Sequence, residues 1–257
     1  MAAPHHTSGL IVPVPQSARS QTDLDGIVNR YKDLRLLGLK VDPKAFSSIY
    51  EEESKFPYET WRSRVVNPIG RTFVALEPDT REGIKTENSE HLETASIDPP
   101  VQQLLEKEWL GIVTLVGPVP FSEQSESATT VHAKLHLAFI KDQTYQIPVS
   151  DSEEVDLKGV HAAYLLVGMF VLPKARRRGL AAQLVNTAIE HARCESREKK
   201  AYKTGISVQV SPSNIAAQGL YERMGFHLSE KAIVLNSRRG GTEHVVGLEM
   251  EIDLRET

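Results

Sequence analysis

Residues 162–181 read AAYLLVGMFVLPKARRRGLA, and this stretch decides the predicted fold. Its first half, residues 162–171, is an unbroken apolar run of the length expected for a strand that is buried on both faces. Pro173 ends the strand, because proline lacks an amide hydrogen and fixes its own φ. From Leu180 the apolar residues recur with the period of an amphipathic helix, so the stretch is predicted to form a strand, a basic turn and a helix.

The turn within residues 171–181 has the features of an anion-binding site. The N-terminus of a helix presents free backbone N–H groups and carries about half a positive charge from the helix dipole. Gly179 and Ala181 keep side-chain bulk away from an approaching phosphate, while Lys174 and the arginines at 176–178 add positive charge. The turn lacks both the Gly-Lys-Ser/Thr ending of a Walker A loop and a Gly-x-Gly-x-x-Gly pattern. A basic surface turn or a nuclear-import patch is the alternative on these residues alone.

A second stretch, residues 210–226, reads VSPSNIAAQGLYERMGF. The first stretch fits the pattern Arg/Gln-x-x-Gly-x-Gly/Ala with Arg176, Gly179 and Ala181. The second fits Asn-x-x-Ala-x-x-Leu-Tyr-x-x-x-Gly-Phe with Asn214, Ala217, Leu220, Tyr221, Gly225 and Phe226. In this order and at this separation, the two stretches resemble motifs A and B of the GNAT superfamily of N-acetyltransferases.

The resemblance implies an α/β fold in which a single mixed sheet is splayed between the motif A and motif B strands and is flanked by helices. The hydrophobic pattern predicts strands at residues 9–14, 71–76, 108–116, 162–171, 206–210, 226–235 and 244–252. It predicts helices at residues 23–39, 46–66 with a break near Pro57, 180–194 and 214–224. Two polar stretches, residues 77–100 and 117–159, are expected to be loop insertions, the second with a possible short strand at 134–140.

The predicted domain organisation is simple. Residues 1–20 are expected to form an N-terminal tail with the first strand, and residues 21–257 the N-acetyltransferase domain. The half of the domain that holds the donor site is expected to begin near residue 160.

The resemblance also implies a donor site for acetyl-CoA as co-substrate. Backbone groups of two strand residues would face the acetyl end and the pantetheine arm, the amides of the basic turn would hold the pyrophosphate, and the motif B helix would supply an amide side chain and a phenol. The cofactor-binding residues are then Met169, Val171, Arg176, Arg177, Arg178, Gly179, Leu180, Ala181 and Asn214, and the catalytic residue, which protonates the leaving thiolate, is Tyr221.

Three of these residues have a structural alternative. Arg176 could anchor its loop by local hydrogen bonds instead of touching phosphate. Asn214 could cap its helix, which is compatible with binding the cofactor as well. Tyr221 could be a core aromatic on the helix face that it shares with Ala217 and Met224.

The general base is left open by the sequence. An ammonium like that of lysine has a pKa of about 10.4, so it needs a base or a chain of waters to react near pH 7. Members of the family often place a glutamate on the motif A strand, but residues 161–167 contain no carboxylate. His161, Tyr164 and the acids at 51–53 are the candidates, and an aryl amine acceptor would relax the demand.

Composition narrows the function classes. The chain has 257 residues, and 30 Lys+Arg against 34 Asp+Glu give a net charge of −4, which disfavours nucleic-acid binding. No apolar run reaches the roughly 18 residues of a membrane helix, and the N-terminus lacks the basic region of a signal peptide. The single cysteine, Cys194, excludes an intrachain disulfide and a cysteine zinc cage, and it is expected to be inert on the apolar side of its helix. A cytoplasmic protein without a metal is predicted.

The leading function is therefore an acyltransferase that moves an acetyl group from acetyl-CoA directly to an amine acceptor, either a small molecule or a peptide. The alternative is a non-catalytic module with a GNAT fold that binds acyl-CoA as a regulator or scaffold. The intact Asn214 and Tyr221 favour the enzyme, and the missing strand carboxylate weakly favours the module.

Overall fold

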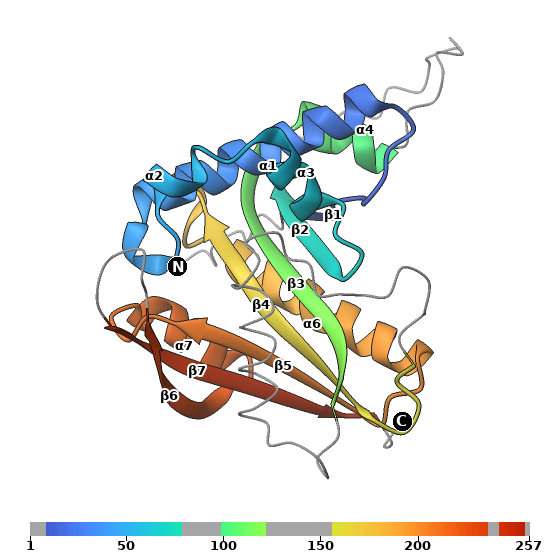
Figure 1. Cartoon of the computed structure of the whole chain (residues 1–257), viewed down its shortest axis with the longest axis vertical. Helices are drawn as coiled ribbons and strands as arrows, with labels where there is room; N and C mark the ends of the chain where they lie inside the picture. The colour runs from blue at the N-terminus through green and yellow to red at the C-terminus, as the bar shows by residue number, and fades with distance from the viewer. Residues whose placement is uncertain (1–8, 79–98, 122–155, 236–241, 255–257) are drawn as a thin grey trace, which may run out of the picture.

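Seven strands form one mixed sheet in the order β1-β2-β3-β4-β5-β7-β6 (Figure 1). The computed structural model describes residues 9–78, 99–121, 156–235 and 242–254. The strands are β1 (Leu10–Pro13), β2 (Gly70–Leu76), β3 (Trp109–Phe121), β4 (His161–Val171), β5 (Lys203–Val210), β6 (His227–Leu235) and β7 (Thr242–Asp253). All neighbouring strands are antiparallel except β4 and β5, which are parallel. The predicted single mixed sheet is confirmed.

Helices cover both faces of this sheet. They are α1 (Gln21–Val41), α2 (Tyr50–Glu53), α3 (Tyr58–Val65), α4 (Pro99–Glu106), α6 (Leu180–Glu198) and α7 (Ile215–Arg223), with the 3-10 turns η1 (Pro43–Ala45) and η2 (Pro173–Ala175). Figure 1 shows α6 behind β3 and β4, and α1, α2 and α3 at the upper ends of these strands. The core lies between these layers, because α6 packs against β2 to β5 while α1 packs against β3 and β4.

The first strand belongs to this sheet although it precedes the predicted domain boundary. β1 pairs antiparallel with β2, from Leu10 opposite Leu76 to Pro13 opposite Phe73. After it, Ser20 caps α1 by accepting a hydrogen bond from the Asp23 amide at 3.0 Å, which satisfies a free N–H of the first turn. The residues before position 21 therefore contribute an edge strand and a helix cap to the domain.

The helix predicted over residues 46–66 is wrong at its start, while the predicted break near Pro57 is confirmed. Residues 46–49 are not helical, and the chain then forms α2 and α3, with a turn and Pro57 between them. Phe46 (φ −125°, ψ 145°) and Ile49 (φ −120°, ψ 147°) have strand-like backbones, and Pro57 stands at the start of α3, where its missing N–H costs no hydrogen bond. The helical spacing of the apolar residues therefore comes from two short helices and the non-helical stretch before them.

The two predicted insertions are shorter than expected. α4 occupies Pro99–Glu106, and its buried Val101 and Leu104 give it an apolar face that is too short to stand out in the sequence. β3 continues five residues past the predicted end at 116, because its last residues pair with the start of β4, Phe121 opposite His161. The possible strand at 134–140 lies outside the described residues.

Cys194 was expected on the buried side of α6, and this expectation is wrong. The thiol is exposed. Leu184, Ala188 and Ala192 define the buried stripe of α6, and Cys194 follows Ala192 by two residues, which is about 200° around the helix axis.

Candidate functional site

The sheet opens between its two parallel strands. β4 and β5 are paired from His161 opposite Lys203 to Leu166 opposite Val208, and the pairing ends there. β4 continues to Val171 against β3, and β5 continues to Val210 against β7, so the two strands diverge as Figure 1 shows. Residues 167–171 therefore present backbone N–H and C=O groups that β5 does not use, which is the edge that an extended ligand can pair with.

A β-bulge lies at the beginning of this opening. Ile112 of β3 is opposite Phe170 and Thr114 is opposite Val167, so Gly168 and Met169 together face one residue of β3. Gly168 has a left-handed φ of +64°, as in bulges that use glycine for the extra residue. The extra residue turns backbone groups out of the ladder, and Met169, expected to face the acetyl group, is part of it.

The turn after β4 exposes a series of backbone amides. Arg177 and Gly179 both have left-handed backbones, with φ of 64° and 80°, and Gly179 is the N-cap of α6. Within the described part of the chain, Gln183 is the first residue of α6 whose amide is hydrogen-bonded, to the Gly179 carbonyl at 3.1 Å. Among the described residues, the backbone amides of residues 177–182 have no backbone partner. They are therefore available to bind an anion at the positive end of the helix dipole.

Arg176 is used within the protein. Its Nε donates to the Val171 carbonyl at 3.0 Å, its Nη2 pairs with the Asp42 carboxylate, and its guanidinium lies 5.9 Å from the centre of the Phe170 ring. The side chain thus anchors the loop, which is the alternative role that the sequence left open. Asp42 was not anticipated as part of this region.

The motif B helix begins on the other side of the opening, beyond the end of β5. Asn214 caps α7 through its Oδ1, which accepts from the Ala217 amide at 3.2 Å, as predicted. Tyr221 is only 2% exposed, and its ring makes a T-shaped contact with Phe226 at 5.4 Å between centroids. Burial raises the pKa of the Tyr221 hydroxyl above its usual 10.0, so the phenol keeps its proton at neutral pH and is able to donate it.

Residues 152–226 match the model of the acetyltransferase (GNAT) family. Over this segment the chain is similar to the acetyltransferase (GNAT) family. The matched segment includes β4, the turn with Gly179, β5 and α7, which are the elements that border the opening. The residues that carry the two motifs therefore lie on the elements that border the opening between β4 and β5.

Two solved structures of one plant protein have the same fold, and a third structure is similar with a lower TM-score. NAA60 from Arabidopsis thaliana in complex with a bisubstrate analogue is 16% identical, with a TM-score of 0.54 over 95% of this chain and 100% of that chain. The same protein in complex with acetyl-CoA is 14% identical, with a TM-score of 0.54 over 95% and 99% of the two chains. A spermidine N-acetyltransferase from Vibrio cholerae with CoA and spermine is 13% identical, with a TM-score of 0.47 over 94% and 95%. No curated protein sequence matches the chain.

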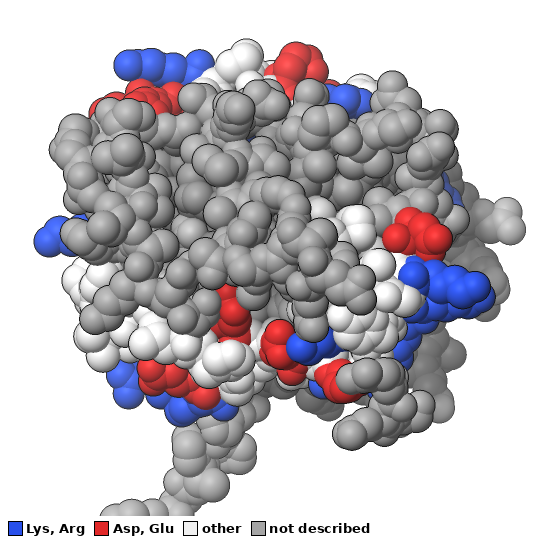
Figure 2. Space-filling model, turned by 60° about the horizontal axis from the view of Figure 1, so that its bottom comes forward, with Lys and Arg blue, Asp and Glu red and all other residues white. Residues whose placement is uncertain are grey.

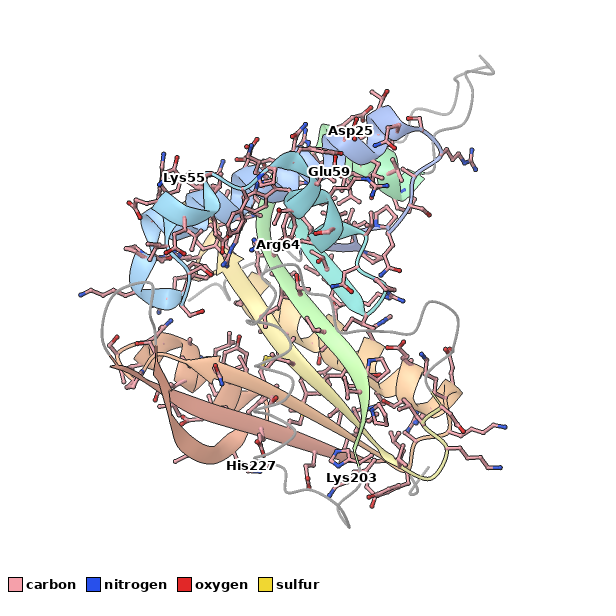
Figure 3. The ribbon with its side chains drawn as sticks, viewed as in Figure 1. Asp25, Lys55, Glu59, Arg64, Lys203 and His227 are labelled. Atoms are coloured by element: carbon pink, nitrogen blue, oxygen red, sulfur yellow. The ribbon has the colours of Figure 1, made fainter. Side chains whose placement is uncertain are left out.

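Two of the candidate bases do not face the opening between β4 and β5. His161 is the first residue of β4 and pairs with Lys203, which Figure 3 labels at the far end of the sheet. At about 3.3 Å per residue, it is roughly 33 Å along the strand from Val171. Tyr164 directs its hydroxyl at α6, where Glu195 and Ser196 are its partners at 3.2 and 3.3 Å.

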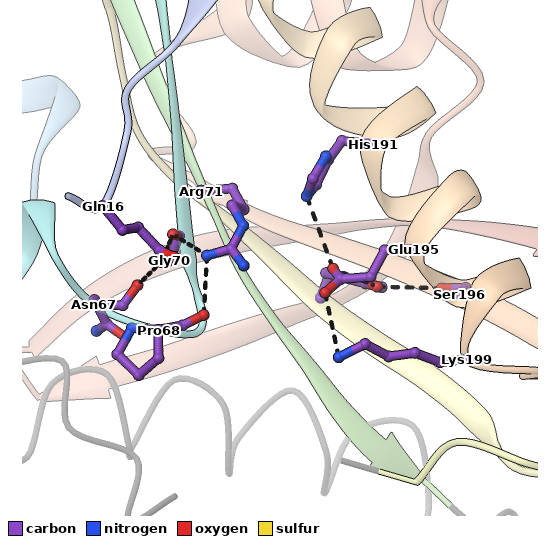
Figure 4. A network of polar contacts seen from close by, with 10 residues as sticks. Gln16, Asn67, Pro68, Gly70, Arg71, His191, Glu195, Ser196 and Lys199 are labelled. Carbon is purple, nitrogen blue, oxygen red and sulfur yellow. Dashed lines mark hydrogen bonds and ion pairs between the residues drawn. The ribbon is translucent and has the colours of Figure 1, made fainter. Parts of the chain in front are cut away.

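Glu195 and its neighbours form a polar cluster of their own. Figure 4 shows Glu195 between His191 and Lys199, at 3.9 and 3.4 Å from them, with Ser196 beside it. Burial raises the pKa of the Tyr164 hydroxyl, so it holds its proton and cannot accept one near neutral pH. This cluster connects β4 to α6.

Of the three candidate acids at residues 51–53, Glu53 is buried in an ion-pair network. Glu53 is fully buried and binds Arg35 through two bonds of 3.1 and 2.8 Å and Arg64 through one of 2.8 Å (Arg64 is labelled in Figure 3). Burial raises the pKa of the Glu53 carboxyl, but the two guanidinium groups outweigh it and lower this pKa from 4.5 to about 2. A carboxylate held in this way is a poor proton acceptor, and it fixes α1, α2 and α3 to one another.

The described residues meet neither the requirement for a metal site nor that for a membrane helix. Among residues 9–78, 99–121, 156–235 and 242–254, no three His, Cys, Asp or Glu side chains come together as a metal site would require. None of the helices in these segments combines the length and the apolar character needed to cross a membrane. Basic and acidic side chains of the described residues lie beside one another on the face shown in Figure 2.

Proposed function

We propose that the chain is an N-acetyltransferase that transfers the acetyl group of acetyl-CoA directly to an amine. The observation that carries the proposal is the divergence of β4 from β5 between the bulge at Gly168 and the amide-rich turn at 177–181. An extended thioester with an anionic end needs both features, with strand-like backbone partners along its arm and an anion site at one end. Residues 21–257 would form the acetyltransferase domain, completed by the edge strand β1.

Each part of acetyl-CoA has a partner in this arrangement. Backbone groups of Met169 and Val171 would bind the acetyl end and the pantetheine arm along the edge of β4. Amides from Arg177 to Ala181, which include those of Arg178, Gly179 and Leu180, would bind the pyrophosphate. The amide side chain of Asn214 would reach the arm from the start of α7 while it caps that helix.

The chemistry follows from this placement. The amine nitrogen attacks the thioester carbonyl carbon, and the carbonyl oxygen becomes an oxyanion that backbone N–H groups at the bulge stabilise. The C–S bond then breaks, the thiolate takes the proton of the Tyr221 hydroxyl, and the amine loses its extra proton to water. The Tyr221 phenolate regains a proton from solvent, which restores the enzyme for the next turnover. No covalent enzyme intermediate is required, so positioning and electrostatic stabilisation supply most of the rate enhancement.

The acceptor must reach the thioester as a neutral amine. A small-molecule or peptide amine would serve, and the free-energy cost of deprotonation depends on its pKa. An α-amino group with a pKa of about 7.7–8.0 costs roughly 1 kcal/mol at pH 7, whereas a lysine-like amine with a pKa of about 10.4 costs roughly 4–5 kcal/mol. A peptide N-terminus therefore requires less help than a polyamine does. We also propose a cytoplasmic location, which suits the exposed free thiol of Cys194.

The test is CoA release from acetyl-CoA in the presence of peptide N-termini, amino acids, aryl amines, polyamines and aminoglycosides. The proposal predicts turnover that depends on one class of amine and on enzyme concentration. Tight binding of acetyl-CoA without turnover across the panel would instead support the non-catalytic acyl-CoA-binding module. Failure to bind acetyl-CoA would remove both functions.

A further inference from the structure

We propose that Asp42 is a positioning residue for the phosphate-binding turn and acts through Arg176 without touching acetyl-CoA. The inference rests on the donor site proposed above and adds a residue that no motif contains. Asp42 stands 134 positions before Arg176 in the chain, and its carboxylate pairs with the Arg176 guanidinium.

Asp42 is itself held in place by the end of α1. It is the C-cap of that helix, where its amide donates to the Gly38 carbonyl at 2.9 Å and its carbonyl accepts from Ala45 at 2.9 Å. α1 packs closely on β4 at this point. A Cβ added to Gly38 would lie only 3.2 Å from the Phe170 ring. The carboxylate is therefore presented to the turn from a fixed position.

Arg176 carries that constraint into the donor site. One edge of its guanidinium binds Asp42, and its Nε binds the carbonyl of Val171, the last residue of β4, at 3.0 Å. The side chain thus connects the C-terminus of α1 to the edge along which the pantetheine arm would lie. Since a guanidinium has donors in a fixed planar arrangement, a lysine at 176 could not make both contacts in the same geometry.

The turn needs such a constraint because it is strained. Arg177, directly after Arg176, has a left-handed φ of 64°, a conformation that costs a residue with a side chain about 1–2 kcal/mol. A strained backbone persists only where surrounding contacts hold it. Weakening the Asp42–Arg176 pair should let the turn relax, and its amides would then no longer converge on the pyrophosphate.

The sign of one substitution separates this role from direct phosphate binding. If Arg176 were a phosphate ligand that Asp42 competes for, Asp42→Asn would release it and tighten CoA binding. If Arg176 positions the turn, Asp42→Asn must weaken binding. The pair is partly exposed, at 41% for Arg176 and 34% for Asp42, so the expected effect is roughly 3- to 5-fold.

The experiment is calorimetric titration of CoA into the full chain and its variants, with acetyl-CoA kinetics in parallel. Asp42→Asn and Arg176→Lys should each raise the Kd for CoA by roughly 3- to 5-fold. The double variant should be no weaker than the weaker single variant, because Asp42 acts only through Arg176. KM for acetyl-CoA should rise while kcat at saturation stays within about twofold, a pattern that a loss of global stability would not produce.

Glu108→Gln is the matched control. Glu108 pairs with Lys174 of the same turn at 2.6 Å, so this change removes one carboxylate beside the turn without touching Arg176. Its Kd for CoA should stay within about twofold of the parent's. Unchanged or tighter binding by Asp42→Asn, multiplicative effects in the double variant, or an equal loss in Glu108→Gln would overturn the inference. If the unaltered chain itself fails to bind CoA, the proposed function fails as well.

Discussion

The proton donor of the proposed reaction is tested by replacing Tyr221 with phenylalanine. The ring is buried and packs on Phe226, and Tyr221→Phe keeps this packing while it removes the hydroxyl. If the hydroxyl donates its proton as the C–S bond breaks, kcat should fall by roughly 10²- to 10⁴-fold, equivalent to about 3–5 kcal/mol of transition-state stabilisation. The Kd for acetyl-CoA should change little, because this interaction forms mainly in the transition state.

The raised pKa of the Tyr221 hydroxyl makes it a weak acid. A phenol with a pKa above 10.0 is a weaker acid than a thiol with a reference pKa of about 8.5, so proton transfer to a solvated thiolate would be unfavourable. A thiolate leaving into the same buried environment has its own pKa raised, which brings the two groups closer in acidity. An acetyl thioester whose thiol has a lower pKa than that of CoA depends less on a proton donor. With such a donor substrate, the loss of kcat caused by Tyr221→Phe should therefore be smaller.

A second variant separates the acid from the core aromatic. Tyr221→Ala removes a ring that is 2% exposed and its edge contact with Phe226, so it should cost about 3–5 kcal/mol of unfolding free energy. Rapid-quench measurement of CoA formation in a single turnover reports the chemical step, and urea unfolding reports stability. Turnover by Tyr221→Phe within a factor of three of the parent would refute the acid role and leave Tyr221 as packing alone.

Three further predictions concern two glycines of the site and the buried Glu53 between α1, α2 and α3. Gly179→Val puts a branched side chain on a left-handed backbone, with the nearest other atom 3.7 Å away, so the loss of CoA affinity measured by titration should exceed the loss of stability measured by urea unfolding. Near-normal affinity would show that the phosphate binds elsewhere. Gly168→Ala has open space for its Cβ but a φ of +64°, so it should cost about 1 kcal/mol of stability and lower kcat about tenfold by shifting the bulge, and an unchanged kcat would detach the bulge from the reaction. The pKa of Glu53 is about 2 in the folded protein against 4.5 in the unfolded chain, so its ionised form contributes about 3 kcal/mol to the free energy of unfolding above pH 4.5, and this contribution is lost as the pH falls towards 2. The free energy of unfolding of Glu53→Gln, measured in urea, should lack this pH dependence, and an equal pH dependence in the two proteins would contradict the prediction.

Much of the fold could be predicted because its signals are local. The buried strand predicted at 162–171 is β4 (His161–Val171), and the helix predicted to begin at Leu180 is α6. A continuous apolar run, a proline and a glycine turn specify this strand, turn and helix without help from the rest of the chain. The same holds for Asn214, whose type and position already mark the start of α7.

Features that depend on tertiary contacts could not be predicted in this way. Asp42 has no unusual neighbours in the sequence, and its importance comes from a guanidinium 134 positions away. Gly168 looks like a glycine inside an apolar run, and only the register against β3 reveals a bulge. Glu53 resembles a solvated acid beside Glu51 and Glu52 until α1 and α3 bring Arg35 and Arg64 to it.

The central claim is that acetyl-CoA lies in the opening between β4 and β5, and hydrogen exchange of the full chain with and without acetyl-CoA tests it most directly. Amides that gain a ligand partner exchange more slowly, so the measurement locates the cofactor without relying on turnover. The account predicts slower exchange in residues 167–182, which hold the bulge and the turn, and in residues 209–217 at the end of β5 and the start of α7. Slower exchange confined to other segments, or no change at saturating acetyl-CoA, would contradict it.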